Sequence, residues 1–256
     1  MLRGLSNAAS ALVAQQLKLD VTANNVANLN TTAFKKKDVQ FKDLLYQEEA
    51  RRGNAVLPAA EKPVTAGTGT AMSAIRTDLS DGVFQVTGRE LDFAIVGPGY
   101  FRVQLPDGSE AYTRAGEFRK DGDGFLVTPQ GYRVQMPQLP AEEHEFRISE
   151  DGIITAITPA GEVIPLGQVM LAYFDNPAGL IKLGGNLYAA SPASGEPRIE
   201  QPGPHTQIKQ FALEGANVDL IVEMTNLIVG QRNFSLNARA LQTLDEMMQT
   251  ANNIRR

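Results

Sequence analysis

The chain has 256 residues, enough for one large domain or two, and its 43% hydrophobic content is ordinary for a soluble globular protein. Its formal net charge of −5 argues against a general nucleic-acid binder. Cysteine is absent, which excludes disulfides, thiolate metal sites and cysteine nucleophiles. No apolar run approaches the roughly 20 residues of a membrane span, so we expect no membrane insertion.

The first 28 residues carry an apolar residue at every seventh position. The repeating residues are Leu5, Leu12, Leu19 and Val26, with Ala9, Gln16 and Ala23 four positions after the first three. This spacing predicts a helix with a narrow seam, as in a coiled coil, and such a helix needs a partner. The apolar residues are spread along the helix and not massed as in a secretory signal, so we expect no cleaved signal peptide.

The C-terminal stretch from Asn217 to Asn253 has no proline and a single glycine, Gly230. Its apolar residues again repeat at seven, at Leu220, Leu227, Phe234, Leu241 and Met248, with Met224, Gln231 and Ala238 four positions after the first three. We expect a second, longer helix, capped by Asn217 or Asp219. The two helices either pack on an ordinary core or pair with each other as a coiled coil.

The middle of the chain has a different pattern. Residues 39–52 are compatible with a short helix or an extended arm, and residues 53–70 are rich in Gly, Pro, Ala and Thr, as in a connector. From residue 71 to 211, short apolar runs alternate with turn signals, which is typical of antiparallel sandwiches and barrels. Arg119–Gly124 and Ser149–Gly152 predict hairpins, and Gly167 predicts a break between two strands.

These patterns predict an α+β fold in which N- and C-terminal helices pair as a coiled-coil stalk, with an antiparallel all-β domain inserted between them. We expect residues 1–30 and 215–256 to form the helical part, 31–70 an extended connector arm and 71–214 the β-rich domain. A stalk with a side domain is a geometry suited to building filaments.

Several motifs resemble the bacterial flagellar basal-body rod and hook protein family. The stretch ANNVAN, Ala23–Asn28, resembles the family's N-terminal signature, and LEGANVDLIVEMTNLIVGQRNF, Leu213–Phe234, resembles its C-terminal signature. The stretches Gln40–Gln47, Gly67–Gly69, Leu91–Val103 and Ala111–Phe118 also resemble the family. The connector between Tyr46 and Gly67 has about the length expected in the distal rod, which favours that branch over the hook and the proximal rod.

The sequence departs from the family pattern at Ala33, where the family usually has glycine. Glycine would permit a positive φ, and alanine adopts it at a cost in strain. The turn from Thr32 to Phe34 is therefore the place where the chain has to accommodate this difference.

The resemblance implies a structural axial subunit of the flagellar basal body, located in the rod within the cell envelope. It implies helical self-association around a central channel, contacts with other rod and hook proteins, and export through the flagellum's own export apparatus. Such a subunit forms a hollow drive shaft that transmits torque from motor to hook.

We expect assembly to rest on the terminal helices, which pair within or between subunits and become ordered as the subunits associate. Amide side chains on these helices are suited to meeting several partners, because an amide both donates and accepts hydrogen bonds. The predicted interface residues are Leu5, Leu12, Leu19, Asn24, Asn25, Val26, Asn28, Leu220, Met224, Leu227, Phe234 and Leu241.

No constellation of an enzyme stands out, so we expect no catalytic residues, no metal and no cofactor. His144 and His205 have no metal-site spacing, and Asp121–Gly124 lacks the later ligands of a calcium loop. An alternative function remains open, an oligomeric β-module that binds glycan or peptidoglycan. Its surface would use Tyr100, Phe101, Tyr112 and Tyr132, which are also compatible with core positions.

Overall fold

The computed structural model describes residues 2–43, 47–48, 65–66, 69–139, 145–157 and 163–254. The chain divides into two compact units. The helical unit consists of residues 1–27, 37–76 and 219–256, and the β unit of residues 28–36 and 77–218. Both units are therefore built from segments that are distant in the sequence.

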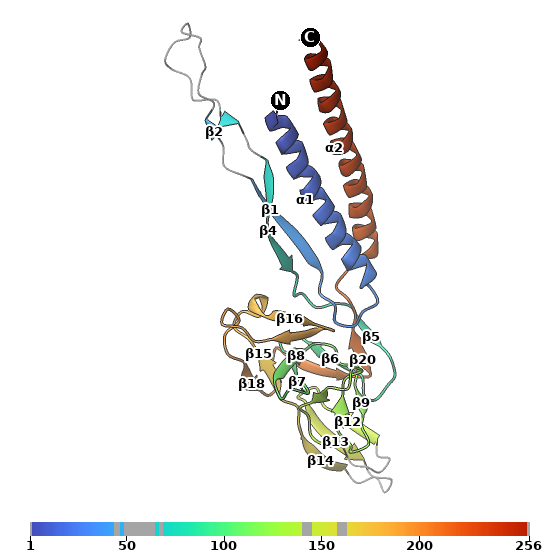
Figure 1. Ribbon diagram of the computed structural model, residues 1–256. Helices are drawn as coiled ribbons and strands as arrows, with labels where there is room; N and C mark the ends of the chain where they lie inside the picture. Colours follow the sequence, from blue (N-terminus) through green and yellow to red (C-terminus); the bar gives the residue numbers. More distant parts are fainter. Residues whose placement is uncertain are drawn as a thin grey trace. The chain divides into compact units, whose positions relative to one another are not determined.

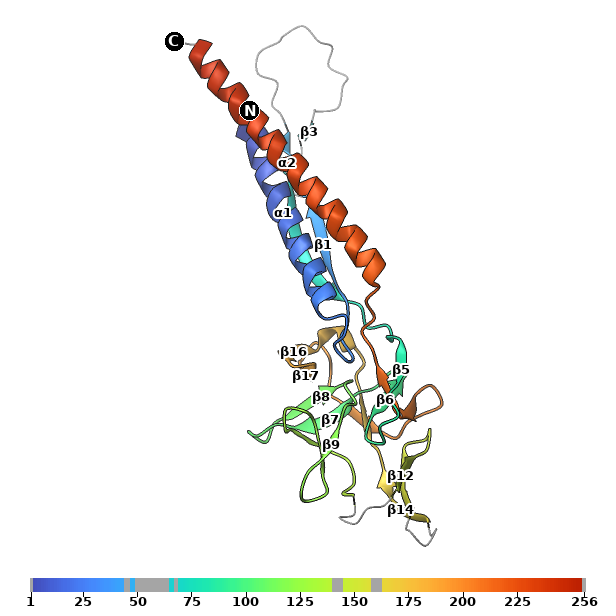
Figure 2. The same ribbon diagram turned by 90° about the vertical axis from the view of Figure 1, so that its right-hand side faces the viewer.

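The helical unit contains two long helices, α1 (Leu2–Ala27) and α2 (Leu220–Ile254), which lie side by side (Figures 1 and 2). Gln15 meets Gly230 and Asn25 meets Glu223, so the two helices run antiparallel. The strands β1 (Lys37–Asp43) and β4 (Thr70–Thr77) form a two-stranded ribbon, and β1 packs along α1. A second short pair joins β2 (Gln47–Glu48) to β3 (Thr65–Ala66).

The helix ends follow their local chemistry. Asp219 caps α2, because its Oδ1 accepts hydrogen bonds from the Ile221 and Val222 N–H groups at 2.8 and 3.1 Å. After α1 the chain turns at residues 28–33, where Ala33 has a φ of 55° and a buried side chain. The left-handed conformation expected of a glycine at this position is thus present in the alanine.

The largest sheet of the β unit has seven strands in the order β16-β17-β8-β7-β11-β10-β9, all paired antiparallel. Its strands are β7 (Phe101–Gln104), β8 (Glu110–Thr113), β9 (Arg119–Lys120), β10 (Leu126–Val127), β11 (Arg133–Val134), β16 (Ile181–Gly184) and β17 (Leu187–Ala189). A short 3₁₀ helix, Pro177–Gly179, precedes β16.

Smaller antiparallel sheets complete the β unit. One has the order β12-β13-β14, with β12 (Glu145–Ile148), β13 (Ile153–Ile157) and β14 (Val163–Gln168). Three pairs are β5 (Phe84–Val86) with β20 (Ala212–Glu214), β6 (Phe93–Val96) with β19 (Gln207–Gln210), and β15 (Leu171–Tyr173) with β18 (Arg198–Glu200).

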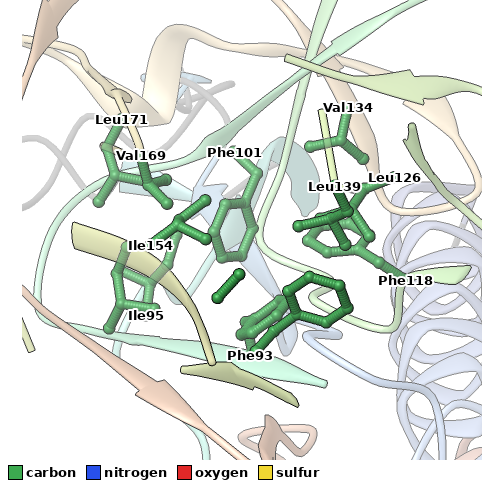
Figure 3. Packing of buried hydrophobic residues seen from close by; sticks show 13 residues of the cluster. Phe93, Ile95, Phe101, Phe118, Leu126, Val134, Leu139, Ile154, Val169 and Leu171 are labelled. Atoms are coloured by element: carbon green, nitrogen blue, oxygen red, sulfur yellow. The ribbon is translucent and has the colours of Figure 1, made fainter. Parts of the chain in front are cut away.

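The core of the β unit is a cluster of thirteen buried apolar side chains drawn from several of these sheets (Figure 3). At its centre, the Phe101 and Phe118 rings meet edge to face with centroids 5.2 Å apart. A second buried cluster consists of Tyr100, Tyr112, Ala172, Phe174 and Tyr188. Tyr100, Phe101 and Tyr112 are thus buried core residues, as the strand-like pattern allowed, and do not form an exposed aromatic surface.

The predicted fold class is confirmed: two terminal helices enclose an antiparallel all-β region in the sequence. The hairpin predicted at Arg119–Gly124 is present with the shorter turn Asp121–Gly124, because Arg119 and Lys120 belong to strand β9, and the hairpin at Ser149–Gly152 is also present. The expected strand break at Gly167 is wrong, because β14 continues through it with a register shift opposite Ile154 and Thr155. Residues 39–43 are extended, whereas 44–46, 49–64 and His144 lie outside the described residues.

Candidate assembly surface on the terminal helices

Three stripes of side chains run along α1, each with the three-and-four spacing of one helix face. One stripe is half-buried or buried toward α2 and contains Ala8, Leu12, Gln15, Leu19, Thr22 and Val26. A second includes Ser10, beside Gly69 at the start of the ribbon, and the buried Val21 and Asn25. The third stripe is exposed throughout and consists of Ser6, Ala9, Val13, Gln16, Asp20, Ala23 and Ala27.

The face of α2 toward α1 also follows a seven-residue repeat. Its residues are buried or half-buried at Glu223, Leu227, Gly230, Asn237, Leu241, Leu244 and Met248. The two helices approach closely at Gly230, where an added Cβ would lie 2.7 Å from Leu19 Cδ2. The Gln15 amide donates a hydrogen bond to the Gly230 carbonyl at 3.3 Å.

The second row of each seam differs from the sequence expectation. It lies three residues after the first row, not four, so Ala9, Gln16 and Ala23 of α1 are exposed. In α2 Met224 and Gln231 are exposed and Ala238 is half-buried, whereas the same shift makes Glu223, Gly230 and Asn237 buried or half-buried. These inner residues are polar or lack a side chain, so an apolar pattern could not identify them.

The twelve predicted interface residues fall into three groups. Half-buried residues are Leu5, Leu12, Leu19, Val26, Asn28, Leu227 and Leu241; exposed ones are Asn24, Leu220, Met224 and Phe234; Asn25 is buried. The exposed residues include Met224, whose side chain is 53% exposed. The helices therefore bury part of the predicted set within one chain and leave another part exposed.

Asn25 of the ANNVAN motif acts as a clamp on the backbone inside the helical unit. Its Oδ1 accepts a hydrogen bond from the Lys37 N–H at 3.0 Å, and its Nδ2 donates to the Lys37 carbonyl at 2.8 Å. The same amide donates to Glu223 Oε2 at 3.3 Å. One buried amide thus joins α1, α2 and the start of β1, which the repeat pattern alone did not indicate.

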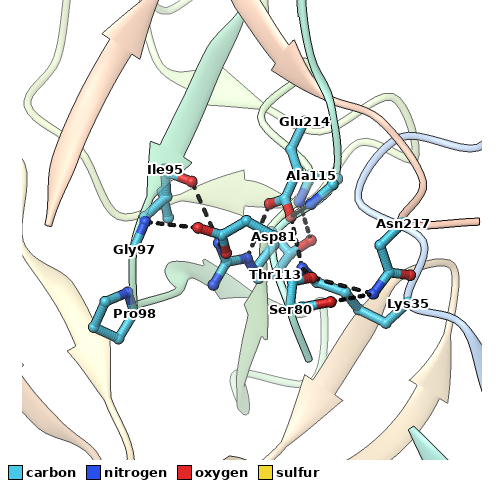
Figure 4. Close-up of polar contacts among 12 residues, drawn as sticks. Lys35, Ser80, Asp81, Ile95, Gly97, Pro98, Thr113, Ala115, Glu214 and Asn217 are labelled. Carbon is cyan, nitrogen blue, oxygen red and sulfur yellow. Dashed lines mark hydrogen bonds and ion pairs between the residues drawn. The ribbon is translucent and has the colours of Figure 1, made fainter. Parts of the chain in front are cut away.

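Asn217 of the EGANVD stretch does the same in the β unit (Figure 4). Its Oδ1 accepts a hydrogen bond from the Lys36 N–H at 2.6 Å, and its Nδ2 donates to the Asp78 and Ser80 carbonyls at 3.0 and 3.1 Å. The Asn217 side chain thus joins three segments of the β unit, at Lys36, at Asp78–Ser80 and at Asn217 itself. Because its amide is used in these bonds, Asn217 does not cap α2.

A buried charge network lies beside this clamp (Figure 4). Lys35 Nζ contacts Glu214 Oε1 and the Ser80 carbonyl, both at 2.6 Å, and Arg114 Nε contacts Glu214 Oε2 at 2.9 Å. Arg114 also reaches Asp81 at 2.8 Å. Burial alone would raise the pKa of Glu214, but the Arg114 and Lys35 charges outweigh it and hold that pKa below its ordinary value of 4.5.

Burial acts on the pKa of Lys35 in the opposite direction to that of Glu214. Burial is the main cause that lowers the pKa of its ammonium group from 10.5, with the Arg114 charge next, and Glu214 only partly compensates. Each charge in the network has a partner, which is the condition for burying charges. The arrangement is structural, and no group of three metal-binding side chains occurs among the described residues.

The two helices can also be compared with the requirements for a membrane-spanning segment. Within the described ranges, neither helix combines the length and apolar character that crossing a membrane requires.

Comparison with known proteins agrees with this architecture of two terminal helices around a β region. Three profiles match the chain: a flagella basal body rod protein profile over residues 5–35, the flagellar hook protein FlgE/F/G D1 domain over 94–156, and the flagellar basal body rod FlgEFG C-terminal profile over 209–254. The chain belongs to the family of flagellar basal-body rod and hook proteins.

Within that family, the chain is similar to relatives named flagellar basal-body rod protein FlgG. It is 41% identical to the one from Agrobacterium fabrum, over 96% of this chain and 97% of the relative. It is 40% identical to those from Borreliella burgdorferi and Bacillus subtilis, over the full length of both chains in each comparison. The protein is thus a structural subunit of the flagellar basal-body rod and not an enzyme, and it is located in the flagellum basal body.

Proposed function

We propose that the protein builds the rod by helical self-association through its terminal helices, and that it joins other rod and hook subunits end to end. The observation that carries this proposal is the exposed apolar surface of α2. Ile221 is 77% exposed, and Met224, Ile228, Val229 and Leu236 are each at least half exposed. A long helix with apolar residues on more than one side is expected to be covered on those sides.

The predicted interface residues have two roles in this proposal. Leu12, Leu19 and Leu227 hold α1 and α2 together within a subunit, while Leu220, Met224 and Phe234 contact neighbouring subunits. Asn24, which is exposed on α1, belongs to this second group. Export through the flagellar apparatus, and a hollow shaft that transmits torque, follow from membership of the rod as further parts of the proposal.

The test is the concentration dependence of association of the full chain, measured by sedimentation. Met224→Glu and Phe234→Glu should each raise the concentration for half-maximal association by about tenfold, since each buries a charge in the complex. The matched control is Val163→Glu, at an exposed apolar position of β14. A full chain that stays monomeric at all concentrations would contradict the proposal.

The glycan-binding alternative has no observation in its favour. Its aromatic surface residues Tyr100, Phe101 and Tyr112 are in the core. Tyr132 remains outside the two buried aromatic clusters but stands alone as a candidate.

A further inference from the structure

The outer side of α2 combines an apolar stripe with the positive charges of two exposed arginines, Arg232 and Arg239. Val222, Val229 and Leu236 follow one another at seven-residue spacing and are 46%, 50% and 62% exposed. A shallow hollow of about 460 Å³ lies beside them, lined by Ile228, Gln231, Arg232, Ser235, Leu236 and Arg239. This stripe and hollow are together the outer face of α2.

Arg232 and Arg239 define the chemistry of this face. They are seven residues apart and therefore on the same side of the helix. Both are exposed, and neither forms an ion pair with another residue in the described part of the chain. The outer face of α2 therefore fits a partner helix that offers an apolar side chain and, close to it, a carboxylate.

The exposed stripe of α1 has these two features. Val13 is its large apolar side chain and is 69% exposed. Asp20, the single acidic residue in α1, lies seven residues further along the same stripe. The other positions of the stripe are alanine, serine and glutamine, which allow close approach of a second helix.

Resting on the self-association proposed above, we propose that the outer face of α2 binds the exposed stripe of α1 from a second copy of this chain. The two helices run antiparallel within one subunit, so they are antiparallel between copies that point the same way. Placing Val13 against Leu236 then puts Asp20 level with Val229, about 4.5 Å of helix rise from Arg232. A long arginine side chain spans that offset.

The contact uses different surfaces on the two copies, so it is heterologous. A subunit that has engaged its α2 face still offers its α1 stripe, and the reverse. Such contacts generate open helical assemblies unless the rotation closes a ring. The contact therefore supplies the directional growth that a rod requires.

The experiment exchanges the charges across the contact in the full chain. One variant is Asp20→Arg, and the other combines Arg232→Asp with Arg239→Asp; Lys18→Asp, on the same helix but outside the stripe, is the control. Each of the first two variants should raise the concentration for half-maximal association by about tenfold, because attraction becomes repulsion. The control should associate as the unchanged chain does.

Mixing the two variants gives the decisive measurement. Their opposite charges are complementary at every contact of an alternating assembly, so the equimolar mixture should regain the association that each variant lacks. Recovery also shows that both variants are folded. If both variants associate like the unchanged chain, or if the mixture does not recover, this pairing is wrong while self-association stands. If the unchanged chain does not associate, the proposed function itself fails.

Discussion

At the scale of single residues, the charges buried around Glu214 govern how the β unit responds to acid. Because the folded-state pKa of Glu214 is lowered, its contribution to stability is fully present above about 4.5 and is lost as pH falls through the folded value. In that window the unfolded chain binds one more proton than the folded chain, so the free energy of unfolding decreases as the pH is lowered.

Glu214→Gln should lower the free energy of unfolding at neutral pH by about 3–5 kcal/mol, because Lys35 and Arg114 lose the charge between them. The difference between the two proteins should shrink as the pH is lowered below 4.5, where the unfolded chain binds a proton at Glu214 that the folded carboxylate does not yet accept. Urea unfolding at several pH values measures this. The exposed Glu200→Gln is the control, and a difference that does not depend on pH would contradict the argument.

Ala33 offers a second test on the scale of one side chain. An L-residue in the left-handed region is strained by roughly 1–2 kcal/mol, and glycine removes that strain while costing about 0.4–1 kcal/mol in unfolded-chain entropy. Ala33→Gly should therefore raise the free energy of unfolding by about 0.5–1 kcal/mol. Ala33→Val, which adds a branched side chain at φ 55°, should lower it in the same denaturation experiment.

At the scale of elements, the pairing of α1 with α2 depends on the close approach at Gly230. Gly230→Val should lower the melting temperature of the helical signal, since its side chain would collide with Leu19. Adding Leu19→Ala opens space and should recover part of the loss, as a double-mutant cycle would reveal. Equal losses with and without Leu19 would show that the contact is not the cause.

The contact between α1 and α2 also shows how much of the fold could be predicted from the sequence alone. The seven-residue repeat predicted both helices, and the turn chemistry predicted the hairpins at Arg119–Gly124 and Ser149–Gly152. The repeat could not tell which of two adjacent faces turns inward, because Gly230 carries no side chain and Glu223 is polar. The partner of Asn25 could not be predicted either, since Lys37 becomes its neighbour only after the chain turns back along α1.

At the scale of the whole molecule, the two compact units predict which fragment folds alone. A fragment of residues 28–218 keeps Lys35 with Glu214 and Asn217 with Ser80, whereas one of residues 71–214 loses Lys35 and Asn217. We expect the longer fragment to unfold cooperatively, and the shorter one to be less stable by about 3–5 kcal/mol because a buried ion pair is broken. Chemical denaturation of both fragments decides this, and equal stability would contradict the boundaries at 28 and 218.

The pairing of Lys35 with Glu214 also sets the order of events during synthesis. A ribosome releases Lys35 early, but its partner follows only after a further 179 residues. Throughout that interval the β unit lacks strand β20, and α1 waits still longer for α2. The newly made chain therefore cannot form the buried Lys35–Glu214 ion pair until it is almost complete. Loss of its last segment would leave α1 without α2 to pack against.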